Sequence, residues 1–156
     1  MLAAEAALGF ALPQLLRRLY LEVSDGDFGP GLLPLYERRS ALNPGVLGSL
    51  VNHYVEWRSA TREEIDTVWG DTDDEDRPMV CPEKLLTIRD LGCNIYSCLD
   101  CSMPESPVLR NDNNISFRTY AVEAPSLHEW LENGLDAKDI SWLDWEQAEK
   151  VTFPLG

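Results

Sequence analysis

Hydrophobic residues recur at helical spacing near the start, the middle and the end of the chain. Segment 2–8 is a short apolar run followed by Gly9, a residue that commonly ends helices in the left-handed conformation. The spacing predicts a second helix after Pro13 and a third over 45–58. A fourth is predicted after Ser126, which begins a capping box.

From residue 84 onward the pattern changes from helical spacing to short runs typical of strands. The runs LLTIRD, CNIYSCLD and PVLRND are separated by short connections rich in turn residues. They predict an antiparallel meander over about 85–112, and residues 115–122 could add another strand. Upstream, LLPLY at 32–36 could form a short strand, whereas SDGDFGPG before it predicts a tight loop.

The length and composition of the chain predict one domain. At 156 residues, of which 44% are hydrophobic, the chain can bury one ordinary core, and we assign residues 1–156 to it. No run approaches the roughly 18 apolar residues of a membrane span. The opening residues fit a secretory signal poorly, because Glu5 interrupts them and no basic stretch precedes them. We therefore expect a cytoplasmic protein with reduced thiols.

The net charge indicates which partners the chain can have. With 27 acidic and 13 basic residues, the formal charge is −14 at pH 7. Such a field repels nucleic acids and anionic membranes, and it accelerates association with a basic protein. An acidic surface can also serve solubility alone, so the charge leaves both interpretations open.

The acidic residues are densest in the segment WGDTDDEDRP, at 69–78. Like charges this close favour an exposed loop. The spacing does not match an EF-hand, which requires a glycine at its sixth position and a glutamate at its twelfth. We expect either a solvated loop or a contact with a basic partner. The candidate partner-binding residues are Asp71, Asp73, Asp74, Glu75 and Asp76.

Cysteines 93, 98 and 101 have a C-x4-C-x2-C spacing that suggests a metal or cluster site. Their surroundings instead predict a strand. Cys93 and Cys101 would then lie about 26 Å apart, and the side chain of Cys98 would point to the face of the sheet opposite theirs. We therefore expect buried structural thiols and no metal or cofactor. If Arg89 and Cys93 close a three-residue hairpin loop, Cys81 lies opposite Cys101.

Few residues are suited to catalysis. The two histidines, His53 and His128, both fall in predicted helices. No Gly-rich nucleotide loop, no HExxH motif and no nucleophile elbow is present. We therefore expect a protein that is not an enzyme.

Three ordered blocks resemble a known family. AEAALGFALPQLLRRLYLEVSDGDFGPG, PEKLLTIRDLGCNIYSCLDCSMPESPVLR and APSLHEWLENGL together look like the SUKH superfamily, the Smi/Knr-like domain, over about residues 5–135. Asp25 and Asp27 depart from the Asn-Gly-Gly turn of that family, and Leu91 stands where its members often have Trp. The resemblance implies an α+β fold, with a mixed or mainly antiparallel twisted sheet packed against helices.

The resemblance also implies a function. It suggests a non-catalytic bacterial immunity protein that binds and neutralises a toxin, often a nuclease. An inhibitor of charge −14 suits a basic toxin. Two alternatives remain: a regulatory or scaffold interaction module of the same fold, and a thiol or metal-binding protein.

Overall fold

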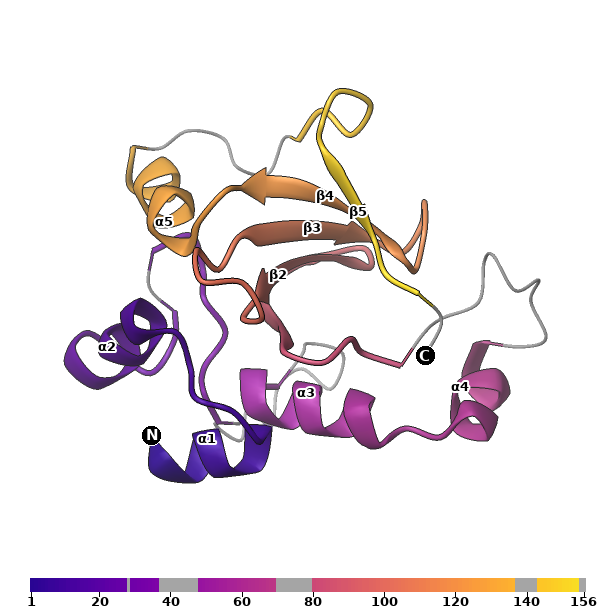
Figure 1. The fold of residues 1–156 in the computed structure, drawn as a ribbon, viewed down its shortest axis with the longest axis horizontal. Coiled ribbons are helices and arrows are strands. Elements are labelled where there is room, and N and C mark those ends of the chain that lie inside the picture. The colour runs from indigo at the N-terminus through magenta and orange to yellow at the C-terminus, as the bar shows by residue number, and fades with distance from the viewer. Residues whose placement is uncertain (28, 37–47, 70–79, 137–142, 155–156) are drawn as a thin grey trace.

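The fold consists of a five-stranded sheet and five helices in the described part of the chain (Figure 1). The computed structural model describes residues 1–27, 29–36, 48–69, 80–136 and 143–154. The elements are α1 (Leu2–Leu8), α2 (Gln14–Glu22), α3 (Leu50–Ser59), α4 (Arg62–Trp69), β1 (Leu85–Gly92), β2 (Ile95–Asp100), β3 (Val108–Asp112), β4 (Thr119–Ala124), α5 (Leu127–Leu135) and β5 (Lys150–Thr152). This arrangement confirms the predicted α+β fold.

The sheet is antiparallel throughout and follows the chain in the order β1-β2-β3-β4-β5. The predicted meander is therefore confirmed. In the view of Figure 1, α1, α2 and α5 lie to the left of the strands, and α3 lies below them. β5 pairs with β4 along the far edge, so residues 150–152 dock on the sheet.

Local capping chemistry decides where the helices begin and end. The prediction for α1 is confirmed: Gly9 has φ 80° and its N–H donates to the carbonyl of Glu5. The predicted start of the third helix at residue 45 is wrong, because α3 begins at Leu50. Ser49 is extended, and its Oγ accepts a hydrogen bond from Asn52 N–H at 3.2 Å, which makes it the helix cap.

The strand predicted over 32–36 does not form. Leu33 N–H donates to the carbonyl of Ile88 in β1 at 2.8 Å, but the ladder stops there. Pro34 has no N–H to donate, and Leu35 N–H donates to the Asp25 carboxylate at 2.8 Å. Residues 32–36 therefore lie beside the sheet without joining it.

The hairpin between β1 and β2 differs from the predicted three-residue loop. Gly92 pairs with Ile95 around a two-residue turn, in which Cys93 and Asn94 have φ 53° and 63°. Positive φ at both central residues is typical of a type I′ turn. The register has two irregularities in β1 and places Lys84 opposite Cys101, whose N–H donates to the Lys84 carbonyl. The predicted pairing of Cys81 with Cys101 is therefore wrong.

The fourth strand begins later than predicted. Ser116 Oγ accepts hydrogen bonds from the N–H groups of Arg118 and Thr119, at 3.2 and 3.1 Å. These bonds hold residues 116–118 in a turn, so β4 starts at Thr119. The predicted capping box at the next helix is present in part, with Ser126 Oγ accepting from Glu129 N–H at 3.2 Å.

Candidate functional site

The two faces of the sheet have different surroundings. One face packs against α1, α2, α3 and α5 and forms the main core, with Leu86, Ile88, Leu99 and Val108 at its centre. The other face, here called the open face, carries a second buried cluster of Leu85, Cys98, Leu109 and Tyr120. Among the described residues, no helix contributes to this second cluster.

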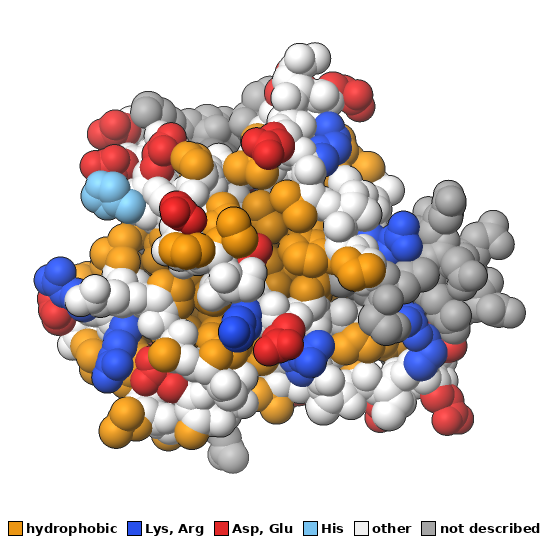
Figure 2. All heavy atoms as spheres, viewed as in Figure 1, with side chains coloured by type: hydrophobic (Ala, Val, Ile, Leu, Met, Phe, Trp, Pro, Cys, Tyr) orange, Lys and Arg blue, Asp and Glu red, His pale blue; other side chains and the backbone are white. Residues whose placement is uncertain are grey.

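Strand register shows which side chains share the open face. One row across the strands contains Asp90, Tyr96, Asn111, Tyr120 and Val151. A second row contains Thr87, Cys98, Leu109 and Val122, and a third pairs Leu85 with Asp100. The rows are mostly apolar, and their two charged members are both acids. Figure 2 shows hydrophobic side chains gathered over the strands in the middle of the molecule, with charged side chains around them.

A small pocket opens where this face meets α3. Its volume is about 40 Å³, and its lining is largely apolar and aromatic. The lining includes His53 and Trp57 from α3, Leu85 from β1, Tyr96 and Cys98 from β2, and Tyr120 from β4. Asn111 and Asn113 add polar groups at its border. Apolar walls with a few polar groups also line ligand sites, but a space of about 40 Å³ admits only a small group and not a whole ligand.

His53 is the titratable base of this pocket. Its ring lies 5.8 Å from that of Trp57 and 6.5 Å from that of Tyr96, measured between centroids. Burial lowers the pKa of His53 to about 4, against a smaller opposing effect of Asp90. The imidazole is therefore neutral at pH 7, and the pocket presents no histidine cation to a ligand.

The four cysteines are free: Cys98 is buried, Cys81 and Cys101 are half-buried, and Cys93 is exposed. The expectation of buried thiols is therefore wrong for Cys93, which lies in the turn between β1 and β2. Burial raises the pKa of Cys81 and of Cys101 to about 12 each. It raises the pKa of the fully buried Cys98 further, against a weaker effect of the hydrogen bond with Thr87. Because thiolates are the reactive form, these three thiols are poor nucleophiles at pH 7. Cys98 packs in the open-face cluster and Cys101 against the main core, which confirms the predicted opposite facing.

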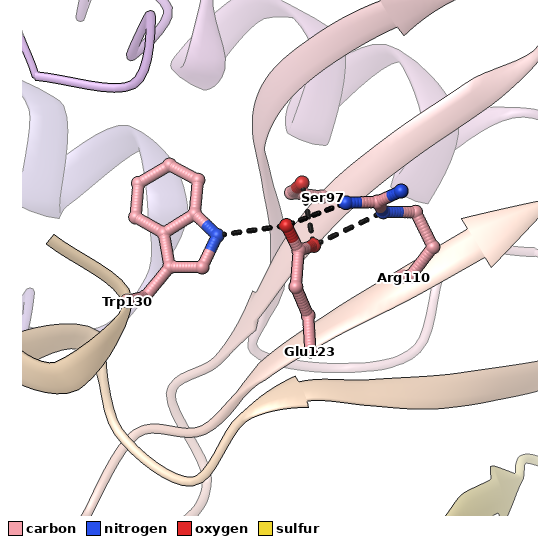
Figure 3. Close-up of polar contacts among 4 residues, drawn as sticks. All are labelled: Ser97, Arg110, Glu123 and Trp130. Atoms are coloured by element: carbon pink, nitrogen blue, oxygen red, sulfur yellow. Dashed lines mark hydrogen bonds and ion pairs between the residues drawn. The ribbon is translucent and has the colours of Figure 1, made fainter. Parts of the chain in front are cut away.

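A buried polar network lies on the helix-covered face of the sheet (Figure 3). The Glu123 carboxylate accepts hydrogen bonds from Arg110 Nη2 at 2.6 Å, Ser97 Oγ at 2.8 Å and Trp130 Nε1 at 3.0 Å. The side chains of Arg110 and Glu123 are only 5% and 4% exposed. The network therefore joins β2, β3, β4 and α5 at one point.

Arg89 contributes a second guanidinium near this network. Burial lowers the pKa of Arg89, against an opposing effect of Glu123. Its Nη1 is buried and has no hydrogen-bond partner. The carboxylate of Glu123 thus compensates the charges of both Arg110 and Arg89. We therefore assign the buried polar network a structural role.

The turn over residues 25–27 is held by a side-chain cap and by positive φ angles. Asp25 caps the loop by accepting from Leu35 N–H. Gly26 has φ 86°, and a Cβ there would lie 2.6 Å from the backbone of Pro34. Asp27, where the sequence departs from an Asn-Gly-Gly turn, has a positive φ of 57°. Aspartate tolerates the left-handed region better than most residues, so it can occupy this position.

The partner-binding residues predicted from sequence stay a prediction. Asp71, Asp73, Asp74, Glu75 and Asp76 lie outside the described residues. The pocket was missed because its residues come from α3 and from the strands β1 to β4. One signal was available: His53 and Trp57 are four residues apart on one helix, beside the core positions Leu50 and Tyr54.

Comparison with known proteins identifies the family. A family model for the SMI1 / KNR4 family (SUKH-1) matches residues 1–133 of the 156. The chain belongs to this family. No curated protein and no solved structure matches it. The matched range covers α1 to β4 and nearly all of α5. The strands β1 to β4 and the helices therefore lie in the SUKH part of the chain, whereas β5 follows it.

Family membership fits an immunity-type protein in general terms. In the described ranges, no helix is long and apolar enough to cross a membrane. Within those same ranges, no three His, Cys, Asp or Glu side chains are grouped so that they could hold a metal ion. The open face and its pocket carry mostly apolar and aromatic side chains, which are suited to contact with another molecule.

Proposed function

We propose that this chain is a non-catalytic, cytoplasmic immunity protein that binds and neutralises a basic protein toxin, and that the toxin is a nuclease. The observation that carries the proposal is the match to the SUKH family over residues 1–133. Nucleases bind polyanions and therefore present basic surfaces. A chain of charge −14 attracts such a surface and raises the rate of encounter.

The chemistry of the pocket supports binding over catalysis. His53 is neutral at pH 7, and burial keeps the thiols of Cys81, Cys98 and Cys101 protonated. A general base or nucleophile would need a pKa closer to the working pH. These groups instead give the pocket a neutral, apolar lining that can accept a side chain of another protein.

The first experiment tests neutralisation directly. A basic protein that the chain retains at low salt from its source cells is expressed in a susceptible host, with and without the chain. We expect growth arrest by that protein alone and restored growth when the chain is present. Persistent arrest, with the chain shown to be folded and soluble, would contradict the proposed function. Association measured at increasing salt should slow as the charges are screened.

A second experiment tests the acidic run at 71–76 as the contact. The variant D73K/D74K/D76K should associate more slowly with the toxin and show a flatter salt dependence. The matched control E105K/E129K/E132K changes the net charge equally at exposed sites elsewhere. An equal effect of both variants would assign the steering to the overall field, and unchanged kinetics in the first would remove the run from the interface.

A further inference from the structure

The open face presents an apolar surface on a packed layer of side chains, as docking surfaces do. Its buried layer of Leu85, Cys98, Leu109 and Tyr120 supports a half-buried apolar surface formed by Tyr96, Val122, Val151 and Phe153. Tyr120 and Phe153 pack edge to face, with their centroids 5.1 Å apart. A contiguous apolar surface of this kind, held by packed strands, loses little side-chain entropy when a partner covers it.

The charges of the open face lie beside the pocket. Asp90 is the cross-strand partner of Tyr96, and Asp100 is the cross-strand partner of Leu85. Both Tyr96 and Leu85 line the pocket. The acids therefore sit near its two ends along the strand direction. The cations close to this region include Arg58, which donates to the carbonyl of Cys81 at 2.9 Å, and Lys84, which precedes Leu85 and lies opposite Cys101.

The spacing of these acids limits what can bind. Tyr96 and Asp100 are four residues apart on β2, which corresponds to about 13 Å along a strand. In an extended partner segment, side chains at positions i, i+2 and i+4 point the same way over the same length. A segment with basic residues at i and i+4 and an uncharged residue at i+2 would match both acids and the pocket between them.

We propose that the open face docks a basic segment of the toxin, which inserts an aliphatic side chain into the pocket between Asp90 and Asp100. The inference rests on the proposed function for its choice of a basic protein as the occupant. The pocket contributes selectivity through shape and the acids contribute it through charge. A negatively charged or strongly polar segment would be rejected, because neutral His53 and the apolar walls offer it no compensation.

The test uses peptides, so that it does not depend on a known toxin. The full-length chain, labelled with ¹⁵N, is titrated with Ac-Arg-Ser-Leu-Ser-Arg-NH₂ and with Ac-Glu-Ser-Leu-Ser-Glu-NH₂. We expect the basic peptide to shift the amide signals of Thr87, Tyr96, Cys98 and Asn111, and the acidic peptide to leave them in place. Shifts confined to another surface, equal shifts with both peptides, or no shifts at all would overturn the proposal.

Variants separate the contribution of the acids from that of the pocket. D90N keeps an oxygen that can accept from Gly92 N–H, as Asp90 does at 2.7 Å, but removes the charge. D90N should lower the affinity for the basic peptide about two- to fivefold. The control E129Q removes an exposed charge on α5 and should leave the affinity unchanged. Equal effects of D90N and E129Q would refute a local role for Asp90.

Y96A should weaken binding more than Y36A does. Tyr36 is 38% exposed and does not line the pocket.

The same variants distinguish the two proposals when the toxin is tested. If the peptide docks but the chain fails to protect cells, the proposed function fails and the docking surface stands. If the chain protects cells and Y96A binds the toxin as well as Y36A does, the docking surface is refuted and the function stands.

Discussion

Folding shields the ionisable side chains of Glu123 and His53 from water, but of these two only Glu123 forms an ion pair with a described residue. Glu123 is paired with Arg110 and accepts further hydrogen bonds from Ser97 and Trp130. His53 lies among aromatic rings, and burial lowers its pKa to about 4. The first arrangement stabilises a buried charge and the second removes one.

Replacement of Glu123 by glutamine should destabilise the protein strongly. E123Q removes the carboxylate and leaves the buried Arg110 uncompensated beside the half-buried Arg89, which costs about 3–5 kcal/mol of unfolding free energy. The measurement is urea unfolding followed by circular dichroism. As a control, S97A removes one hydrogen bond to the same carboxylate with little change of volume and should cost about 1 kcal/mol. A loss below about 0.5 kcal/mol in E123Q would show that the charge pair contributes little, as exposed pairs do.

His53 should make stability depend on pH below neutrality. Its pKa is about 4 in the folded protein and about 6.5 when exposed, so the unfolded chain binds a proton at a higher pH. The unfolding free energy therefore falls as pH decreases from about 6.5 to about 4. H53Q should flatten this part of the profile relative to the parent.

The control for that measurement is H128Q. The side chain of His128 is 71% exposed and lies 3.4 Å from Glu132. Its replacement should leave most of the acid-side slope in place. Identical slopes in the parent and H53Q would contradict the burial of His53 in a neutral form.

At the scale of elements, short side-chain caps and turns decide the boundaries. Thr61 and Glu64 form a capping box: Glu64 N–H donates to Thr61 Oγ1 at 3.2 Å, and Thr61 N–H donates to Glu64 Oε2 at 2.7 Å. Ser49 caps α3, so the helix begins at Leu50 and not at the predicted residue 45. Both are local hydrogen bonds, but only the first has a two-residue signature that sequence shows clearly.

The hairpin between β1 and β2 provides a test of turn chemistry. Cys93 has φ 53°, and a residue with a Cβ is strained there by about 1 kcal/mol, whereas asparagine tolerates this region. C93N should therefore raise the unfolding free energy by about 0.5–1 kcal/mol. C93V should lower it, because a branched Cβ is disfavoured at positive φ. Thermal unfolding of the two variants checks this, and equal stability of both would contradict the type I′ turn.

At the scale of the whole molecule, the net charge of −14 opposes compactness. Surface ion pairs such as Arg18–Glu22 are exposed and compensate this repulsion only weakly. The fold therefore depends on two apolar layers, one on each face of the sheet. The same negative field that destabilises the isolated chain would favour its association with a basic partner.

Screening of that field should stabilise the chain. Raising NaCl from about 10 to about 300 mM shortens the Debye length from about 30 Å to below 10 Å. We expect the unfolding free energy to rise by on the order of 1 kcal/mol, or about 2–4 °C in Tm. E105K/E129K/E132K, which is less acidic, should respond less. A fall in Tm with salt would show that attractive pairs dominate over the net charge.

The sequence by itself determined the elements and the family. Helix α1, the meander and the opposite facing of Cys98 and Cys101 follow from patterns that are local along the chain. Local patterns specify periodicity, and periodicity specifies faces. The ordered SUKH blocks were equally visible, because their turn and cap residues stand at short spacings along the chain.

Only the tertiary structure decided the register and the site. The irregularities in β1 and the turn at Cys93 moved the pairing, and no periodicity reports a one-residue shift. The pocket joins His53 on α3 to Tyr96 and Tyr120 on two strands, and the Glu123 network joins three strands to a helix. Such groupings depend on which distant segments pack together, and packing is set by the whole core instead of by any local stretch of sequence.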